Sequence, residues 1–134
     1  MAWDGYSWIV ATDPPGYGTG PVANGVPVPT TAPTVAMQWT PARPVPCRVE
    51  VSCTVVTAAT TVTLTATWVD PQAGPQSYTW ENATTLSPGV RFELPLLLTA
   101  AAGEPVQVVV TAGTANQVYV TGRITPLVAF GAIG

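Results

Sequence analysis

The 134-residue chain contains no histidine and no lysine, and only 8% of its residues are charged. Histidine is the usual general base and lysine a common nucleophile, so most acid–base and covalent catalysis lacks its side chains here. Four arginines are the only cations and the net charge is −3, so no basic stripe is present to follow a phosphate backbone. The sequence therefore predicts a protein that is not an enzyme, with no catalytic residues, and that does not bind nucleic acid.

Metal ligands and long apolar runs are also scarce. The two cysteines, Cys47 and Cys53, form no Cys-x-x-Cys pair, and without histidine there are too few ligands for a typical metal site. No apolar run reaches the roughly 18 residues that a membrane-spanning helix requires, and the stretch 94–102 is both too short and interrupted by Pro95. We expect no metal, no other cofactor, no membrane segment and no secretory signal.

Acidic side chains are the remaining candidates for catalysis, since a pair of them can hydrolyse a glycosidic bond. Asp70 and Glu104 lie in segments typical of turns, and Glu81 and Glu93 flank one loop. We interpret these four residues as turn formers and solvated strand ends rather than as a catalytic pair.

The two cysteines are six positions apart in a segment with the pattern of one strand, so both side chains should lie on one face. At about 3.3 Å per residue their Cα atoms would be roughly 20 Å apart, well beyond the ~7 Å limit for a disulfide. The sequence predicts two free, buried thiols.

The first 34 residues are rich in proline and glycine, which favour neither a helix nor a regular strand ladder. We expect residues 1–34 to form an extended arm. Its large apolar side chains are costly to leave in water, and the apolar C-terminal tail has the same property. Residues expected to bind a partner surface are Trp3, Tyr6, Trp8, Ile9, Tyr17, Phe130 and Ile133.

From Val35 onward, short segments rich in valine, threonine and leucine alternate with a period of two between turn residues. Residues 48–57 and 61–68 show the pattern most clearly. The side chains expected to face the core there are Val49, Val51, Cys53, Val55, Val62, Leu64, Ala66 and Trp68. Further strands are expected at 35–39, 77–80, 92–98, 106–111 and 118–125.

In the segment that contains residues 92–98, Phe92, Leu94, Leu96 and Leu98 alternate with Arg91, Glu93, Pro95 and Leu97, and Pro95 favours an edge strand. About seven to eight strands at this spacing are typical of a sandwich. The predicted fold is all-β, an antiparallel β-sandwich or jelly roll over residues 35–134 that follows the arm.

The low charge leaves little polar surface for a monomer, so we expect a homo-oligomer, most simply a trimer. Trp39, Trp68 and Trp80 are interpreted as core or interface residues. An exposed tryptophan platform for carbohydrate is the alternative.

The stretch 60–127 resembles the small β-sandwich virion proteins of tailed bacteriophages. The resemblance rests on three segments: TLTATWVD at 63–70, AAAGEPVQVVVT at 100–111 and VYVTGRITPL at 118–127. It implies a capsid decoration or head-stabilising protein that binds the major capsid protein or another virion protein after assembly in the host cytoplasm. Such proteins are often trimers with arms that reach their neighbours. The resemblance also allows a tail or fibre component, and a carbohydrate- or surface-binding sandwich is the alternative from another class.

Overall fold

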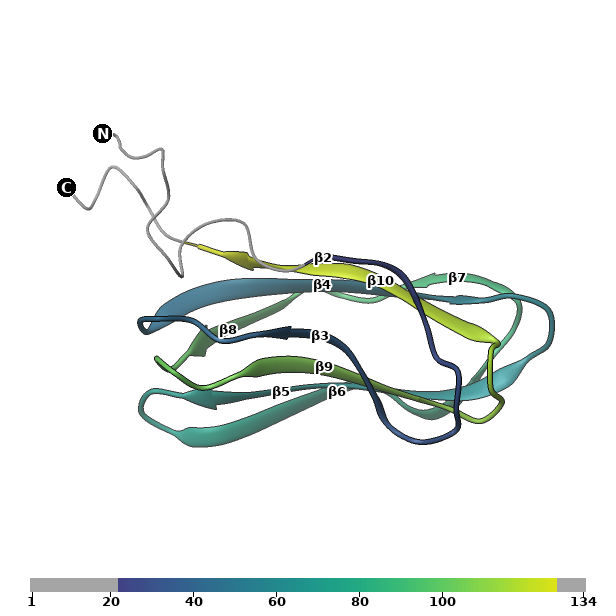
Figure 1. Cartoon of the computed structure of the whole chain (residues 1–134), viewed down its shortest axis with the longest axis horizontal. Helices are drawn as coiled ribbons and strands as arrows, with labels where there is room; N and C mark the ends of the chain where they lie inside the picture. Colours follow the sequence, from purple (N-terminus) through teal and green to yellow (C-terminus); the bar gives the residue numbers. More distant parts are fainter. Residues whose placement is uncertain (1–21, 128–134) are drawn as a thin grey trace.

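The computed structural model describes residues 22–127, in which nine strands form two sheets packed face to face (Figure 1). The first sheet has the order β2-β10-β4-β7, and β8 also pairs with β4. Its strands are β2 (Val22–Pro27), β4 (Val45–Val55), β7 (Gly89–Phe92), β8 (Leu96–Ala100) and β10 (Val118–Pro126). The second sheet has the order β3-β9-β5-β6. Its strands are β3 (Thr34–Trp39), β5 (Thr60–Asp70), β6 (Gly74–Leu86) and β9 (Val106–Ala112).

Every strand pair in the described part of the chain is antiparallel, which confirms the predicted all-β sandwich. Among residues 22–127 no helix is long or apolar enough to cross a membrane.

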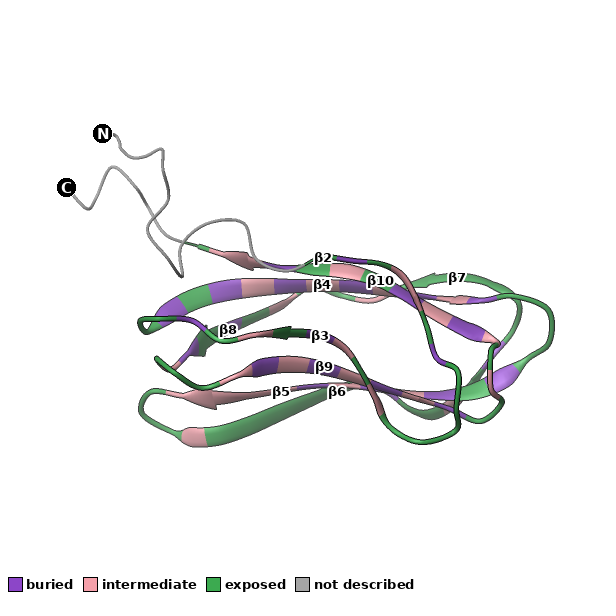
Figure 2. Ribbon diagram, viewed as in Figure 1, coloured by how far each residue is buried: buried purple, intermediate pink, exposed green. Residues whose placement is uncertain are grey.

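The core lies between the two sheets, and buried side chains alternate with more exposed ones most clearly along β4, β5 and β9 (Figure 2). On β4 and β5 the predicted inward faces are confirmed, from Val49 to Val55 and from Val62 to Ala66, while Trp68 is half-buried against the core. Threonines fill the outward positions of β5 because a β-branched side chain suits a pleated, half-buried surface. Period-two alternation therefore decides which face of each strand is apolar.

Part of the segment expected to be an arm belongs to the sandwich. β2 pairs with β10, and the next residue, Val28, is fully buried. The amide of Val28 donates to the Val118 carbonyl at 3.0 Å, and the amide of Asn116 donates to the Val28 carbonyl at 2.9 Å. The prolines do not prevent this because Pro27 ends an edge strand, where a missing N–H is tolerated. The strands of the sandwich thus begin by Val22 rather than at Val35.

The predicted strand over 92–98 is divided into two. β7 ends at Phe92 and β8 begins at Leu96, and we call residues 93–95 the β7–β8 link. Leu96 and Leu98 face the core, but Phe92 and Leu94 are 79% and 78% exposed, so the single alternating strand expected over this segment is wrong. The reason is that Pro95 cannot donate to the ladder, so the alternation does not continue through the link.

Candidate functional site

The seven residues expected to bind a partner, Trp3, Tyr6, Trp8, Ile9, Tyr17, Phe130 and Ile133, all lie outside the described residues. Within residues 22–127 a different surface has the character expected of a contact site. Its elements are β7, the β7–β8 link and β8, which lie along one side of β4.

This surface consists of Val90, Phe92, Leu94 and Leu97, which are 55%, 79%, 78% and 68% exposed. We call these four side chains the apolar ridge. Phe92 pairs with Ser52 of β4 and Leu97 with Arg48, so both register with outward-facing positions of the first sheet. Scattered exposed leucines are normal, but four large apolar side chains within eight consecutive residues form a patch of the kind that marks contact sites.

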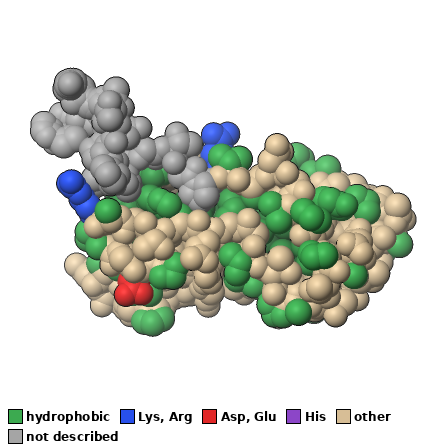
Figure 3. All heavy atoms as spheres, in the orientation of Figure 1, with side chains coloured by type: hydrophobic (Ala, Val, Ile, Leu, Met, Phe, Trp, Pro, Cys, Tyr) green, Lys and Arg blue, Asp and Glu red, His purple; other side chains and the backbone are tan. Residues whose placement is uncertain are grey.

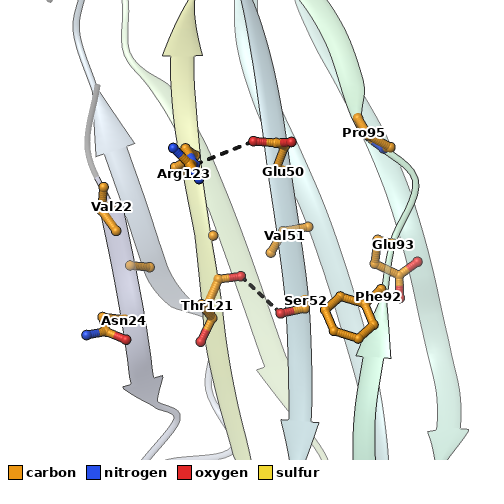
Figure 4. A pocket seen from close by; sticks show the side chains of 12 residues that line it. Val22, Asn24, Glu50, Val51, Ser52, Phe92, Glu93, Pro95, Thr121 and Arg123 are labelled. Atoms are coloured by element: carbon orange, nitrogen blue, oxygen red, sulfur yellow. Dashed lines mark hydrogen bonds and ion pairs between the residues drawn. The ribbon is translucent and has the colours of Figure 1, made fainter. Parts of the chain in front are cut away.

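A shallow groove of about 580 Å³ borders the ridge on the outer face of the first sheet. Val22 of β2 lies on one side, and Phe92 and Pro95 lie on the other (Figure 4). Between them the floor includes Ser52, whose hydroxyl donates to the Thr121 carbonyl at 3.4 Å. The groove therefore has apolar walls and a polar floor.

Gly122 lies on the groove floor, where β10 and β4 approach closely. A Cβ at this position would collide with the backbone carbonyl oxygen of Glu50. The neighbouring Arg123 carries the only guanidinium at the groove among residues 22–127, and its Nε lies 3.5 Å from Oε1 of Glu50. The glycine thus permits the close approach of β10 to β4 at this point.

A cluster of charged side chains lies on the inner side of the same edge. Nε of Arg91 is 3.3 Å from Oε2 of Glu81 and 3.5 Å from Oε2 of Glu93. The side chains of Glu81 and Glu93 are only 3% and 7% exposed. Glu81 comes from β6 of the second sheet, so the cluster joins the two sheets where they face each other at this edge.

The interpretation of these two acids as solvated residues beside a loop is therefore wrong. Glu81 is in the middle of β6 and pairs with Leu64, and Glu93 begins the β7–β8 link. The physical reason is non-local: Arg91 supplies a positive charge between carboxyl groups that are twelve positions apart in the sequence. Single-sequence periodicity contains no signal for such a contact.

Burial raises the pKa of Glu93 to about 7, helped by a hydrogen bond that the protonated Glu93 donates to Glu81 and by the charge of Glu81, while Arg91 opposes the shift. A carboxyl group with a raised pKa is the pattern of a general acid. Here, however, the carboxyl group of Glu93 points away from Ser52 and Thr121 on the groove floor (Figure 4). Glu81 does not line the groove, and Glu93 lines it with a side chain that is only 7% exposed.

Of the other two candidate acids, Asp70 ends β5 at the start of the turn that leads to β6, and Glu104 lies in a loop. Oδ1 of Asp70 accepts the backbone amides of Gln72 and Ala73 at 2.8 and 2.9 Å, which lowers the pKa of Asp70. Glu104 is exposed in the segment between β8 and β9. Among residues 22–127, no group of three or more histidine, cysteine, aspartate or glutamate side chains is placed to hold a metal ion.

The described tryptophans pack against the core. Trp39, Trp68 and Trp80 are all partly buried there, in agreement with the core interpretation. Trp80 meets Tyr78 edge to face, with ring centroids 5.6 Å apart, and its indole N–H donates to the Leu94 carbonyl at 2.8 Å. This indole is therefore not free to bind a sugar hydroxyl.

Cys47 and Cys53 are free and fully buried on the inner face of β4, as the sequence predicts. Burial raises the pKa of each thiol to about 12. Because the thiolate is the nucleophile, we expect iodoacetamide to alkylate the native protein at least about a hundredfold more slowly than the urea-unfolded chain. Mass spectrometry over time measures both rates. Rapid alkylation of the native protein, or a Cys47–Cys53 bridge, would contradict the buried-thiol assignment.

Comparisons of the chain with protein-family models, with curated proteins and with solved structures find no match in any of the three.

Proposed function

We propose that this chain is a non-enzymatic structural protein that attaches to other protein subunits through the apolar ridge. The observation that carries the proposal is the exposure of Phe92 and Leu94, at 79% and 78%, within a short segment of an edge. Buried aromatic and aliphatic side chains are the usual anchors of protein interfaces. Exposed apolar side chains lower solubility, and a partner that covers them forms a complex stabilised by the removal of apolar area from water.

The low charge of the surface supports the same proposal. Few charged side chains appear among the hydrophobic and uncharged polar groups on the face seen in Figure 3. Charged residues are depleted at the centres of interfaces, and a surface poor in charge does little to oppose association. This surface supports the proposal of a homo-oligomer, for which we propose a trimer.

The proposed setting is a virion, where the chain would act as a capsid decoration or head-stabilising protein on the lattice of the major capsid protein. The support for this setting is the resemblance of residues 60–127 to small virion sandwiches, together with a sandwich fold that suits the role. Mass spectrometry of purified particles of the virus whose genome encodes this chain would test the proposed setting. Absence of the chain from those particles would refute the virion setting and leave the docking surface to be tested separately.

The double variant Phe92→Ser/Leu94→Ser is expected to weaken self-association at least about tenfold, since each large apolar anchor contributes more than about 1.4 kcal/mol at an interface. Light scattering coupled to size exclusion should give a multiple of 13.8 kDa for the unchanged protein and a shift toward the single-chain mass for the variant.

Val35→Ser is the matched control, because Val35 is also an exposed apolar residue but lies on β3 of the second sheet, away from the ridge. The control should associate like the unchanged protein. A single-chain mass for the unchanged protein at micromolar concentration would overturn the homo-oligomer. Equal association of both variants would overturn the role of the ridge.

A further inference from the structure

The charged cluster beneath the apolar ridge is unbalanced. Two carboxyl groups, those of Glu81 and Glu93, meet a single guanidinium, that of Arg91. If both acids were ionised, the cluster would have a net negative charge, although the side chains of Glu81 and Glu93 are almost completely buried. Two carboxylates that share a buried site do not both ionise easily, and one of them then retains its proton.

The hydrogen bonding of the two carboxyl groups also indicates that one of them retains its proton. Oε2 of Glu81 and Oε2 of Glu93 are buried and lack a hydrogen-bond donor within residues 22–127, although each lies near Nε of Arg91. An unsatisfied buried acceptor costs about 1–3 kcal/mol, and more when it is charged. A proton on one carboxyl group supplies the missing donor, because a protonated acid can donate to the oxygen of its ionised neighbour.

The surrounding strands supply no second cation. Cys53 of β4 pairs in register with Arg91, and its thiol is affected by the negative charge of both acids. The other charged residues of β4, Arg48 and Glu50, pair with each other on the outer face at 3.7 Å. β8 has no ionisable side chain, and the only one on β5 is Asp70 at its far end. Within residues 22–127, these neighbouring strands therefore place no second guanidinium beside the two acids.

We propose that Glu81 and Glu93 hold one shared proton that ties the two sheets together at this edge, and that loss of the proton to solvent loosens the β7–β8 link. Phe92, the last residue of β7, and Leu94 of the link flank Glu93 in the sequence, so the proposed site controls how the apolar ridge is presented. Two further bonds hold the same segment: the amide of Glu93 donates to the Val51 carbonyl at 3.2 Å, and Trp80 donates to Leu94.

The sign of the pH dependence follows from the raised pKa of Glu93, about 7 in the folded chain. The folded chain binds more protons than the unfolded chain between the ordinary pKa of glutamate and about 7. The stabilising contribution is therefore complete at acidic pH and is lost as the pH rises through neutrality.

Three measurements on the full chain test the proposal. Side-chain carboxyl NMR should show Glu93 titrating near neutrality. Hydrogen exchange at the Trp80 indole, corrected for the intrinsic rate, should be about tenfold faster above neutrality than at mildly acidic pH. Denaturant unfolding across the same range should show the matching loss of stability.

The Glu93→Gln variant keeps the shape of the side chain without its charge, so its Trp80 exchange and its unfolding midpoint should change little across this pH range. The Glu81→Gln variant should lower the pKa of Glu93 toward its ordinary value, because an amide donates to the carboxylate and removes the like charge. Glu104→Gln, at an exposed acid outside the cluster, is the control and should retain the pH dependence of the unchanged chain.

Titration of Glu93 near its ordinary value would overturn the proposal. An unchanged pH dependence of stability in Glu93→Gln would also overturn it. If that variant does not fold, an unchanged pKa of Glu93 in Glu81→Gln would overturn the proposal instead. None of these measurements involves a partner protein, so their outcome is independent of the proposed function.

Discussion

A chain that begins at Thr34 is expected to lose on the order of 5 kcal/mol of stability, a large share of the 5–15 kcal/mol typical of a domain. This truncation removes β2 and Val28 together. The core then loses the buried side chains of Ala23 and Val28, and the amide and carbonyl bonds of Val28 to the β9–β10 side of the molecule disappear. The edge of β10 is also left without the strand that pairs with it.

The informative comparison is a chain that begins at Val22, which keeps all of these contacts. Circular dichroism during urea unfolding should show a cooperative transition for this second chain and a weakened or absent one for the chain beginning at Thr34. Equal midpoints for the two truncations would show that β2 adds nothing to the fold. In that case the sandwich would be complete from β3 onward.

The Gly122→Ala variant is expected to lose about 3 kcal/mol or more, because the new methyl group would collide with a backbone atom that cannot rotate away. That atom is the carbonyl oxygen of Glu50 on the neighbouring strand. Relief requires β10 and β4 to separate in the middle of the longest pairing of the first sheet, which runs from Val118 opposite Val55 to Pro126 opposite Cys47. Thermal or denaturant unfolding measures the loss.

Arg123→Ala serves as the control at the adjacent position. Arg123 is 62% exposed, and its ion pair with Glu50 is a surface pair of the kind worth about 0–1 kcal/mol. A loss in Gly122→Ala no larger than that of Arg123→Ala would mean that the two strands can separate at little cost.

The strand-forming segments of this protein could be predicted from the sequence because they are encoded locally. Alternation with a period of two places Val49 and Leu64 in the core whichever strands lie beside them. The free thiols of Cys47 and Cys53 follow from parity and distance along one strand, which are also local properties. The turn between β5 and β6 is set by its own residues, including Asp70, whose carboxylate accepts the amides of Gln72 and Ala73.

Tertiary structure alone decided the features that depend on partners distant in the sequence. Composition places Val22–Pro27 in an arm, yet β10 offers an open edge and a buried position for Val28, and pairing there outweighs the local preference. The buried contact of Glu81 and Glu93 depends on Arg91 and on the stacking of two sheets. Period-two patterns determine which face of a strand is apolar, but they carry no information about which strand lies opposite. For that reason the core of this protein can be predicted from its sequence, whereas the apolar ridge and the charged cluster beneath it cannot.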